Sequence, residues 1–180
     1  MPDTGHSVSS AHSFEDLVAE VYQPLQRYLR RRTDAESADD VLGDVLLVLW
    51  RRAESIPAGA ELAWCYGVAR RCLANNLRQS SRQRRLVARL ASEVPTSDPG
   101  SDPVLDEALA QLSAPDQELL RLWAWEQLTA PDIAQVLGIT SNAASIRLHR
   151  AIKKLERQLT ERKERDRSGQ PVQRQGEETR

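Results

Sequence analysis

The chain has few residues able to perform catalysis or to bind a metal. It contains only two cysteines and three histidines in 180 residues. Cys65 and Cys72 lie seven positions apart in a helical stretch, so they share one face and are interpreted as small core residues, with a redox pair as the alternative. His6 and His12 fall in a segment expected to be disordered, and His149 stands apart from them. Because no nucleophile and base or metal-ligand set can be assembled, the sequence predicts a non-enzyme with no catalytic residue, metal or cofactor.

Long apolar runs are also missing. No stretch approaches the ~18 to 20 apolar residues that a membrane span requires. The beginning of the chain lacks the hydrophobic segment of a signal peptide. We therefore expect a cytoplasmic protein with no membrane insertion.

The chain carries no excess of positive charge, which at first argues against binding to nucleic acid: its net charge is -1. The charges are, however, separated into blocks. Between positions 62 and 92 there is no acidic residue but there are seven arginines, namely Arg70, Arg71, Arg78, Arg82, Arg84, Arg85 and Arg89. Between positions 90 and 120 there are seven acidic residues and no basic one. A basic block is typical of phosphate binding, and an acidic neighbour would repel DNA or shield the basic surface; two solvated faces of opposite sign are the alternative.

Residues 129–151 have the pattern of a helix-turn-helix. Thr129 can cap a first helix in a capping box with Asp132, and Pro131 falls in the first turn, where a missing N–H costs little. Gly138 can supply the left-handed residue that ends this helix. The pattern predicts two short helices joined by a tight turn.

The second helix of this motif is predicted to start at Thr140 or Ser141 and to expose a polar face. Its outward positions include Asn142, Ser145, His149 and Arg150. These side chains have the length and polarity needed to reach base edges and phosphates in a major groove. A buried helical hairpin with a polar face would show the same pattern.

Proline, glycine and small polar residues concentrate in one internal segment, residues 91–103, which we interpret as a flexible acidic linker. The sequence predicts an all-α fold with two small helical domains on either side of it, at residues 13–90 and 104–159. Residues 1–12 and the charged residues 160–180 are expected to be disordered tails.

The second predicted helix, at about residues 35–52, is apolar nearly all round, which indicates that it buries more than one face. On its remaining side Asp40, Gly43 and Asp44 surround Leu47. A small acidic and apolar patch of this kind suits a docking partner helix. Packing inside the domain would explain the extra leucines equally well.

The third predicted helix, at about residues 60–90, carries Trp64, Arg71, Asn75 and Arg78 along one face. An aromatic ring can stack on an unpaired base while guanidinium groups neutralise phosphates, so this face suits single-stranded or distorted DNA. A core position for Trp64 is equally consistent with the pattern.

Together these segments resemble a bacterial extracytoplasmic-function (ECF) sigma factor, a small sigma-70-like initiation factor, over residues 13–159. Residues 14–17 resemble the opening helix of that family, and residues 38–50 resemble the region 2.2 segment that docks on the polymerase clamp. Residues 64–74 are similar to the segment that opens and holds the promoter -10 element. Residues 108–151 resemble region 4, whose second helix reads the -35 element.

The resemblance implies a sigma factor that binds the clamp and flap of core RNA polymerase and directs promoter-specific initiation on DNA. The residues expected to bind core polymerase are Asp40, Gly43, Asp44 and Leu47. Those expected at the -10 element are Trp64, Arg71, Asn75 and Arg78. Those expected at the -35 element are Asn142, Ser145, Ile146, Arg147, His149 and Arg150. A cognate anti-sigma factor is a further partner that the family implies.

Two positions depart from the family pattern. Gly43 stands where the family usually has glutamine, which removes a side-chain contact and costs ~1 kcal/mol of helix propensity relative to alanine. Ser145 and Ile146 replace a usual Arg-Ser pair, so the promoter sequence cannot be transferred from relatives.

Two other classes of protein share parts of this pattern. A sigma-like adaptor or antagonist would keep the protein-binding surfaces but would not need the seven arginines at positions 70 to 89. A stand-alone helix-turn-helix regulator would normally be a dimer, and the sequence has no heptad repeat or other obvious dimerisation element.

Overall fold

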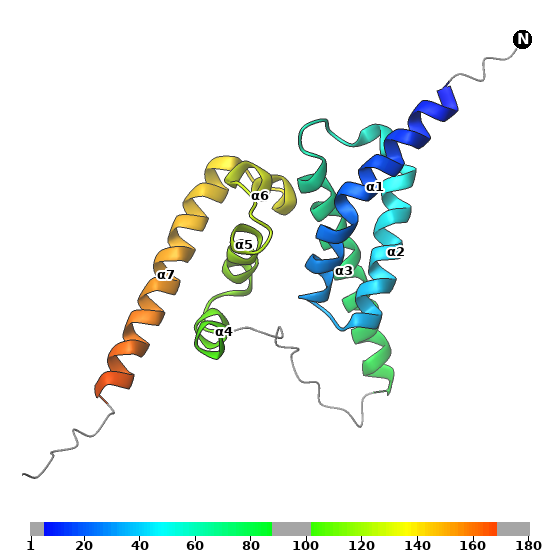
Figure 1. Cartoon of the computed structure of the whole chain (residues 1–180). Helices are drawn as coiled ribbons and strands as arrows, with labels where there is room; N and C mark the ends of the chain where they lie inside the picture. The colour runs from blue at the N-terminus through cyan, green and yellow to red at the C-terminus, as the bar shows by residue number, and fades with distance from the viewer. Residues whose placement is uncertain (1–5, 88–101, 169–180) are drawn as a thin grey trace, which may run out of the picture.

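The computed structural model describes residues 6–87 and 102–168 (Figure 1). Its elements are α1 (His6–Arg30), α2 (Ala35–Arg51), the short 3-10 helix η1 (Ala53–Ser55), α3 (Glu61–Val87), α4 (Pro103–Ala110), α5 (Ala114–Ala124), α6 (Ala130–Leu137) and α7 (Ser141–Ser168). These two segments contain helices and their connections but no strand, so the predicted all-α fold is confirmed.

The helices α1, α2 and α3 pack against one another as an amino-terminal bundle (Figure 1). The turn into α2 is fixed by Asp34, whose carboxylate accepts a hydrogen bond from the Ser37 N–H at 2.9 Å. The apolar stripes of the three helices meet in a common core, which includes Val21, Leu25, Leu29, Val41, Val45, Leu49, Cys65 and Ala69. Because these stripes face inward, the opposite faces of α2 and α3 remain on the surface.

The helices α4 to α7 form a carboxyl-terminal unit in which α6 and α7 are the predicted helix-turn-helix. Thr129 and Asp132 make the predicted capping box at the start of α6. Gly138 ends the helix with φ of 67°, and the next residue, Ile139, donates its N–H to the carbonyl of Ala134 at 3.0 Å. Thus the local chemistry of the sequence sets both ends of α6.

Short helices α4 and α5 pack against the long helix α7 (Figure 1). Their apolar contacts form a second, smaller core of Leu109, Leu112, Leu120 and Ala151. Lys154 of α7 donates to the Asp116 carboxylate of α5 at 2.6 Å, which lowers the pKa of that carboxyl. These contacts give α7 a fixed position relative to α5.

The main core continues from the bundle into the carboxyl-terminal unit. Leu119, Leu122 and Ile133 are completely or almost completely buried in the same cluster as the bundle residues. The helices α3 and α6 are in contact, and a Cβ placed on Gly67 would lie 3.8 Å from the Cα of Val136. The two predicted domains are therefore packed together in this structure, and the division at residues 91–103 stays a prediction because residues 88–101 lie outside the described residues.

Two helices extend beyond their expected ends. α1 begins at His6, so residues 6–12 are helical and Ser13 lies inside the helix, where we expected a tail up to residue 12. α7 continues to Ser168, where we expected a tail from residue 160. Neither extension contains glycine or proline, and the second is rich in helix-forming glutamate, lysine and arginine. Arg162 in this extension also forms an ion pair with Glu107 of α4.

Two glycines with different backbone conformations provide a test of the assigned helix boundaries and backbone geometry. Gly138 has φ of 67° and open space around it, so Gly138→Ala should lower the free energy of unfolding by ~1 kcal/mol through backbone strain alone. Gly43 lies inside α2 with no atom near its would-be Cβ, so Gly43→Ala should raise that free energy by ~0.5 to 1 kcal/mol. Urea unfolding followed by circular dichroism measures both, and changes of the same sign would contradict the assigned backbone conformations.

Candidate functional site

The predicted docking patch lies on the outer face of α2. Asp40, Gly43 and Asp44 are exposed, and Leu47 retains 47% of its surface in contact with solvent. The opposite stripe of α2 is buried in the bundle, so these four residues lie together on the remaining face. A partly exposed leucine beside two carboxylates can bury apolar surface against a partner and pair with basic groups.

One neighbouring residue extends this patch and was not assigned to it from the sequence. Trp50 is 58% exposed, and its ring meets Phe14 of α1 edge to face, with ring centroids 5.0 Å apart. The sequence signal was present, since Trp50 lies three residues after Leu47 on the same helix. The exposed apolar surface of α2 is therefore larger than the predicted patch.

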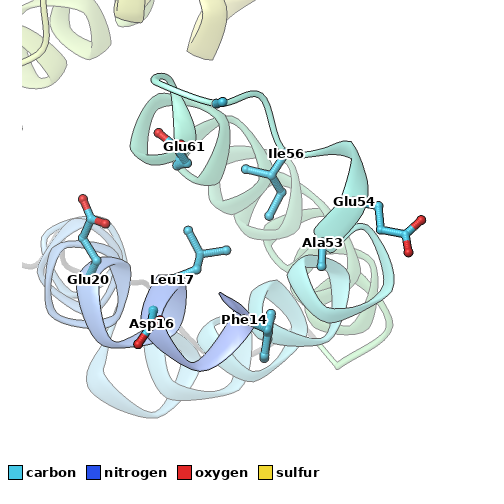
Figure 2. A pocket seen from close by; sticks show the side chains of 9 residues that line it. Phe14, Asp16, Leu17, Glu20, Ala53, Glu54, Ile56 and Glu61 are labelled. Carbon is cyan, nitrogen blue, oxygen red and sulfur yellow. The ribbon is translucent and has the colours of Figure 1, made fainter. Parts of the chain in front are cut away.

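A pocket of about 460 Å³ opens beside this face, between the middle of α1, the η1 segment and the start of α3 (Figure 2). Phe14, Leu17 and Ile56 supply apolar surface. The charged residues lining it are all acidic, namely Asp16, Glu20, Glu54 and Glu61. Such a lining repels phosphate groups, which separates this pocket from any nucleic-acid surface.

The predicted -10 residues lie along α3. Arg71, Asn75 and Arg78 are all exposed, and Arg78 donates to the Asn75 side-chain carbonyl at 2.5 Å. Trp64, in contrast, is half-buried and packs partly against the main core. The structure thus places the three polar members together on the surface, with the tryptophan closer to the core.

These three α3 residues line a second pocket, of about 630 Å³, between α1, α3 and α5. Arg70 of α3 and Arg32, just beyond the end of α1, also line it, so four guanidinium groups come together there. Arg32 was not predicted from the sequence, because only the fold brings the end of α1 beside α3. The signal for it was the run of three arginines at positions 30 to 32.

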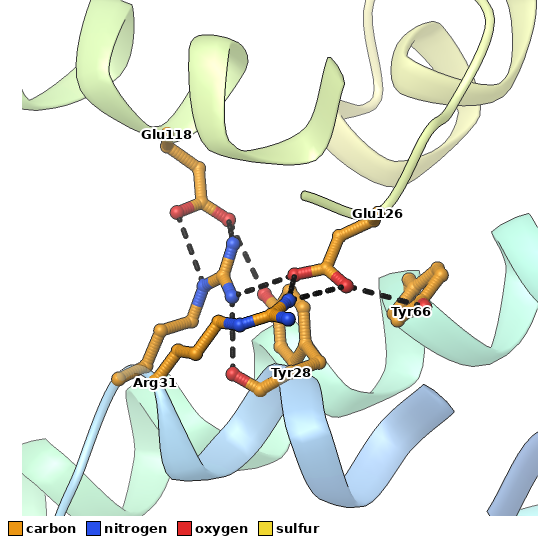
Figure 3. Close-up of polar contacts among 6 residues, drawn as sticks. Tyr28, Arg31, Tyr66, Glu118 and Glu126 are labelled. Atoms are coloured by element: carbon orange, nitrogen blue, oxygen red, sulfur yellow. Dashed lines mark hydrogen bonds and ion pairs between the residues drawn. The ribbon is translucent and has the colours of Figure 1, made fainter. Parts of the chain in front are cut away.

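Two carboxylates of the carboxyl-terminal unit reach the arginines at the end of α1 (Figure 3). Arg32 donates from Nε to Glu118 at 3.3 Å and from a terminal nitrogen to Glu126 at 3.1 Å. Arg31 donates to Glu126 at 3.4 Å. The Arg32 and Glu126 side chains are only 6% and 3% exposed, so this ion pair is almost completely buried.

Two tyrosines of the bundle complete these contacts. Tyr28 donates its hydroxyl to Glu118 at 3.3 Å, and Tyr66 donates its hydroxyl to Glu126 at 3.4 Å. Burial, and then the adjacent carboxylates, raise the pKa of both phenols well above the ordinary value. Both tyrosines therefore remain hydrogen-bond donors at neutral pH. We call this group the seam cluster, consisting of Tyr28, Arg31, Arg32, Tyr66, Glu118 and Glu126.

The predicted -35 residues lie on the first turns of α7, and all six are exposed. Five of them share one stripe at helical spacing: Asn142, Ser145, Ile146, His149 and Arg150. Ala144 and Ala151, on the opposite side, are completely buried. This face of α7 is therefore available to a major groove.

Two of these residues have local contacts that the sequence did not predict. Arg147 lies off the stripe and lines a pocket with Asp116 and Arg70, where its charge helps to lower the pKa of the Asp116 carboxyl. Ser145 donates its hydroxyl to the Ser141 carbonyl at 3.0 Å, one turn earlier in α7. The remaining stripe residues are the stronger candidates for base contacts.

Among the side chains that the structure describes, at residues 14–81 and 102–164, no group of three or more histidine, cysteine or acidic residues is arranged to hold a metal ion. No helix within residues 6–87 and 102–168 is both long enough and apolar enough to cross a membrane. The two cysteines are unpaired thiols, with Cys65 buried and Cys72 half-buried.

Comparison with known proteins matches these features to one family. The family described as Sigma-70, region 4, matches residues 104–155, which contain α6 and the exposed polar stripe of α7. The ECF RNA polymerase sigma factor SigL of Mycobacterium tuberculosis is 30% identical over 169 residues, covering 88% of this chain and 95% of SigL. The chain belongs to the ECF RNA polymerase sigma factor family, as the resemblance predicted.

Solved structures show the same fold. The sigma factor RpoE of Bartonella quintana, in complex with the anti-sigma factor NepR, superposes with a TM-score of 0.64 at 22% identity, covering 82% of this chain and 96% of that chain. CnrH, in complex with the cytosolic domain of CnrY, gives 0.56 at 21% identity, covering 84% of this chain and 94% of that chain. At these identities the likeness concerns the arrangement of helices.

The cysteines provide a test of the core assignment. Burial raises the pKa of the Cys65 thiol to about 12, and burial followed by the charge of Asp44 raises that of Cys72. Since the thiolate is the reactive form, native Cys65 should react with Ellman's reagent at pH 8 far more slowly than in denaturant. Cys72→Ser isolates the Cys65 signal. Equal rates for folded and unfolded protein would contradict a buried Cys65.

Proposed function

We propose that this chain binds core RNA polymerase and directs promoter-specific transcription initiation, acting with polymerase in the cytoplasm. The observation that carries the proposal is the coexistence, in one ECF sigma-family chain, of an exposed acidic and apolar face on α2 and an exposed polar stripe on α7. One face suits a protein partner, whereas the other suits DNA.

In this proposal each surface has one partner. The α2 patch around Leu47 docks on the polymerase clamp, and the carboxyl-terminal unit lies at the flap, where α7 reads the -35 element. The α3 residues Arg71, Asn75 and Arg78 hold the -10 element, with Trp64 at the end of the same stripe. Exposed guanidinium groups on α3 support this role because they can neutralise the phosphates of the opened strand.

A cognate anti-sigma factor is a further proposed partner. The structural neighbours RpoE and CnrH were solved in complexes, with NepR and with the cytosolic domain of CnrY, respectively. In this chain the exposed Leu47, Trp50 and Ile146 would offer apolar contacts to such a partner. Covering either face would block polymerase docking or DNA reading.

Polymerase docking should depend on the charge of the α2 patch. Asp44 is exposed beside Leu47, so Asp44→Arg should leave the circular dichroism spectrum and melting temperature nearly unchanged. Affinity for core polymerase should fall by at least about tenfold, which is ~1.4 kcal/mol. Glu15→Arg, an equal charge reversal at an exposed position of α1, is the matched control. Undiminished binding by Asp44→Arg in a titration would exclude this face from docking.

Base reading should depend on Arg150. Arg150→Ala should cost ~1 to 3 kcal/mol on the cognate -35 sequence and relax selectivity at one base pair, because a guanidinium can donate two hydrogen bonds to a guanine edge. Arg157→Ala, about two turns further along α7, should weaken binding to all sequences equally or have no effect. A base-by-base promoter scan distinguishes these results. Parallel losses at every base for Arg150→Ala would assign this arginine to the phosphates.

A further inference from the structure

The seam cluster joins the two predicted DNA-reading parts of the chain through charge. Both of its carboxylates, Glu118 and Glu126, come from α5 and the segment that follows it. Its guanidinium and hydroxyl donors come from α1, the turn directly after α1, and α3 (Figure 3). These ion pairs therefore lie between the bundle and the carboxyl-terminal unit, and they would break if the units separated.

Burial makes the cluster sensitive to the removal of either partner. Arg32 is 6% exposed, and its guanidinium also lies over the Tyr28 ring, 3.7 Å from the ring centroid. A buried guanidinium without an anion is strongly disfavoured. When Glu118 and Glu126 leave, Arg32 must become hydrated or bind another anion.

The surroundings of Arg32 suit an anion with several negative charges in a row. Arg32 lines the same pocket as the α3 arginines at positions 70, 71 and 78, and Glu118 is the one acidic residue of that described lining. Guanidinium groups bind carboxylates and phosphates with the same forked geometry, so the two kinds of anion compete for one site. The row of arginines continues the proposed -10 face from α3 to the end of α1.

We propose that Arg31 and Arg32 form a phosphate-binding site for the DNA backbone, which Glu118 and Glu126 occupy when the two units are packed together. DNA and the carboxyl-terminal unit then exclude each other from the end of α1. The free chain binds DNA weakly for this reason, and separation of the units extends the basic face by two arginines. That the competing polyanion is DNA rests on the proposed function. That Arg31 and Arg32 are occupied by carboxylates rests only on their contacts with Glu118 and Glu126.

The two carboxylates are not the only groups that hold the two units together, because apolar contacts also favour the packed state. α3 and α6 lie against each other near Gly67 and Val136, and residues of both units belong to one buried apolar cluster, so the units also share buried apolar surface. This surface favours the packed state in water irrespective of charge. Neutral glutamines at positions 118 and 126 should therefore weaken the hold on the arginines while both units stay folded.

The test measures the free full-length chain, without polymerase, by fluorescence anisotropy with a short labelled duplex unrelated to any promoter. The double variant Glu118→Gln with Glu126→Gln should bind the duplex at least about fivefold more tightly than the wild type. The matched control, Glu15→Gln with Glu36→Gln, removes the same charge at exposed positions of α1 and α2 and should change affinity by less than about twofold. Circular dichroism shows whether each variant is folded.

A second comparison identifies the arginines. Adding Arg31→Ala and Arg32→Ala to the glutamine variant should abolish the increase in affinity and reduce the logarithmic salt slope by ~0.9 for each phosphate that is no longer neutralised. An equal increase in the control, no binding by the glutamine variant, or an unchanged slope after the arginine substitutions would overturn the proposal. Because polymerase is absent, such a failure would leave the docking of α2 on polymerase untouched, and its own test would still decide the proposed function.

Discussion

The buried pairing of Arg32 with Glu118 and Glu126 determines how the two halves of this chain meet. Ion pairs with such low exposure fix orientation more surely than they add stability, because their desolvation offsets much of their attraction. Beside this pairing, α3 packs against α6 through apolar contacts. These contacts stabilise the association of the two units but do not fix its orientation, because the hydrophobic effect is non-directional. The helix-turn-helix therefore packs against the bundle through α6, and the polar stripe of α7 stays exposed.

The same division between buried and exposed faces lets one helix pack into the core and also present a surface to a partner. On α2, Val41 and Val45 are completely buried while Asp44 and Leu47 remain on the surface. On α7, Ala144 and Ala151 are buried while the polar stripe points outward. Small buried residues let α7 lie close to its neighbours, and this close packing gives the stripe a rigid support.

Much of the fold could be predicted from local signals. Thr129, Asp132 and Gly138 determine the ends of α6 through capping and a left-handed backbone, which depend only on neighbouring residues. The helical extension of α7 was missed because charged residues without glycine or proline favour helix as well as disorder. The seam cluster could not be predicted, since its members lie 86 to 95 residues apart for the Arg32–Glu118 and Arg31–Glu126 pairs. Which carboxylate meets which arginine is decided by tertiary packing, on which helical periodicity gives no information.

Run-off transcription with purified core polymerase on a library of upstream DNA regions tests the central claim most directly. The account predicts transcripts that require this chain and start at a limited set of sites sharing two sequence elements, because α3 and α7 would each read one. Core polymerase without the chain should give none of these transcripts. Binding of the chain to core polymerase with no chain-dependent transcript from any region would contradict the account and would favour an adaptor or antagonist.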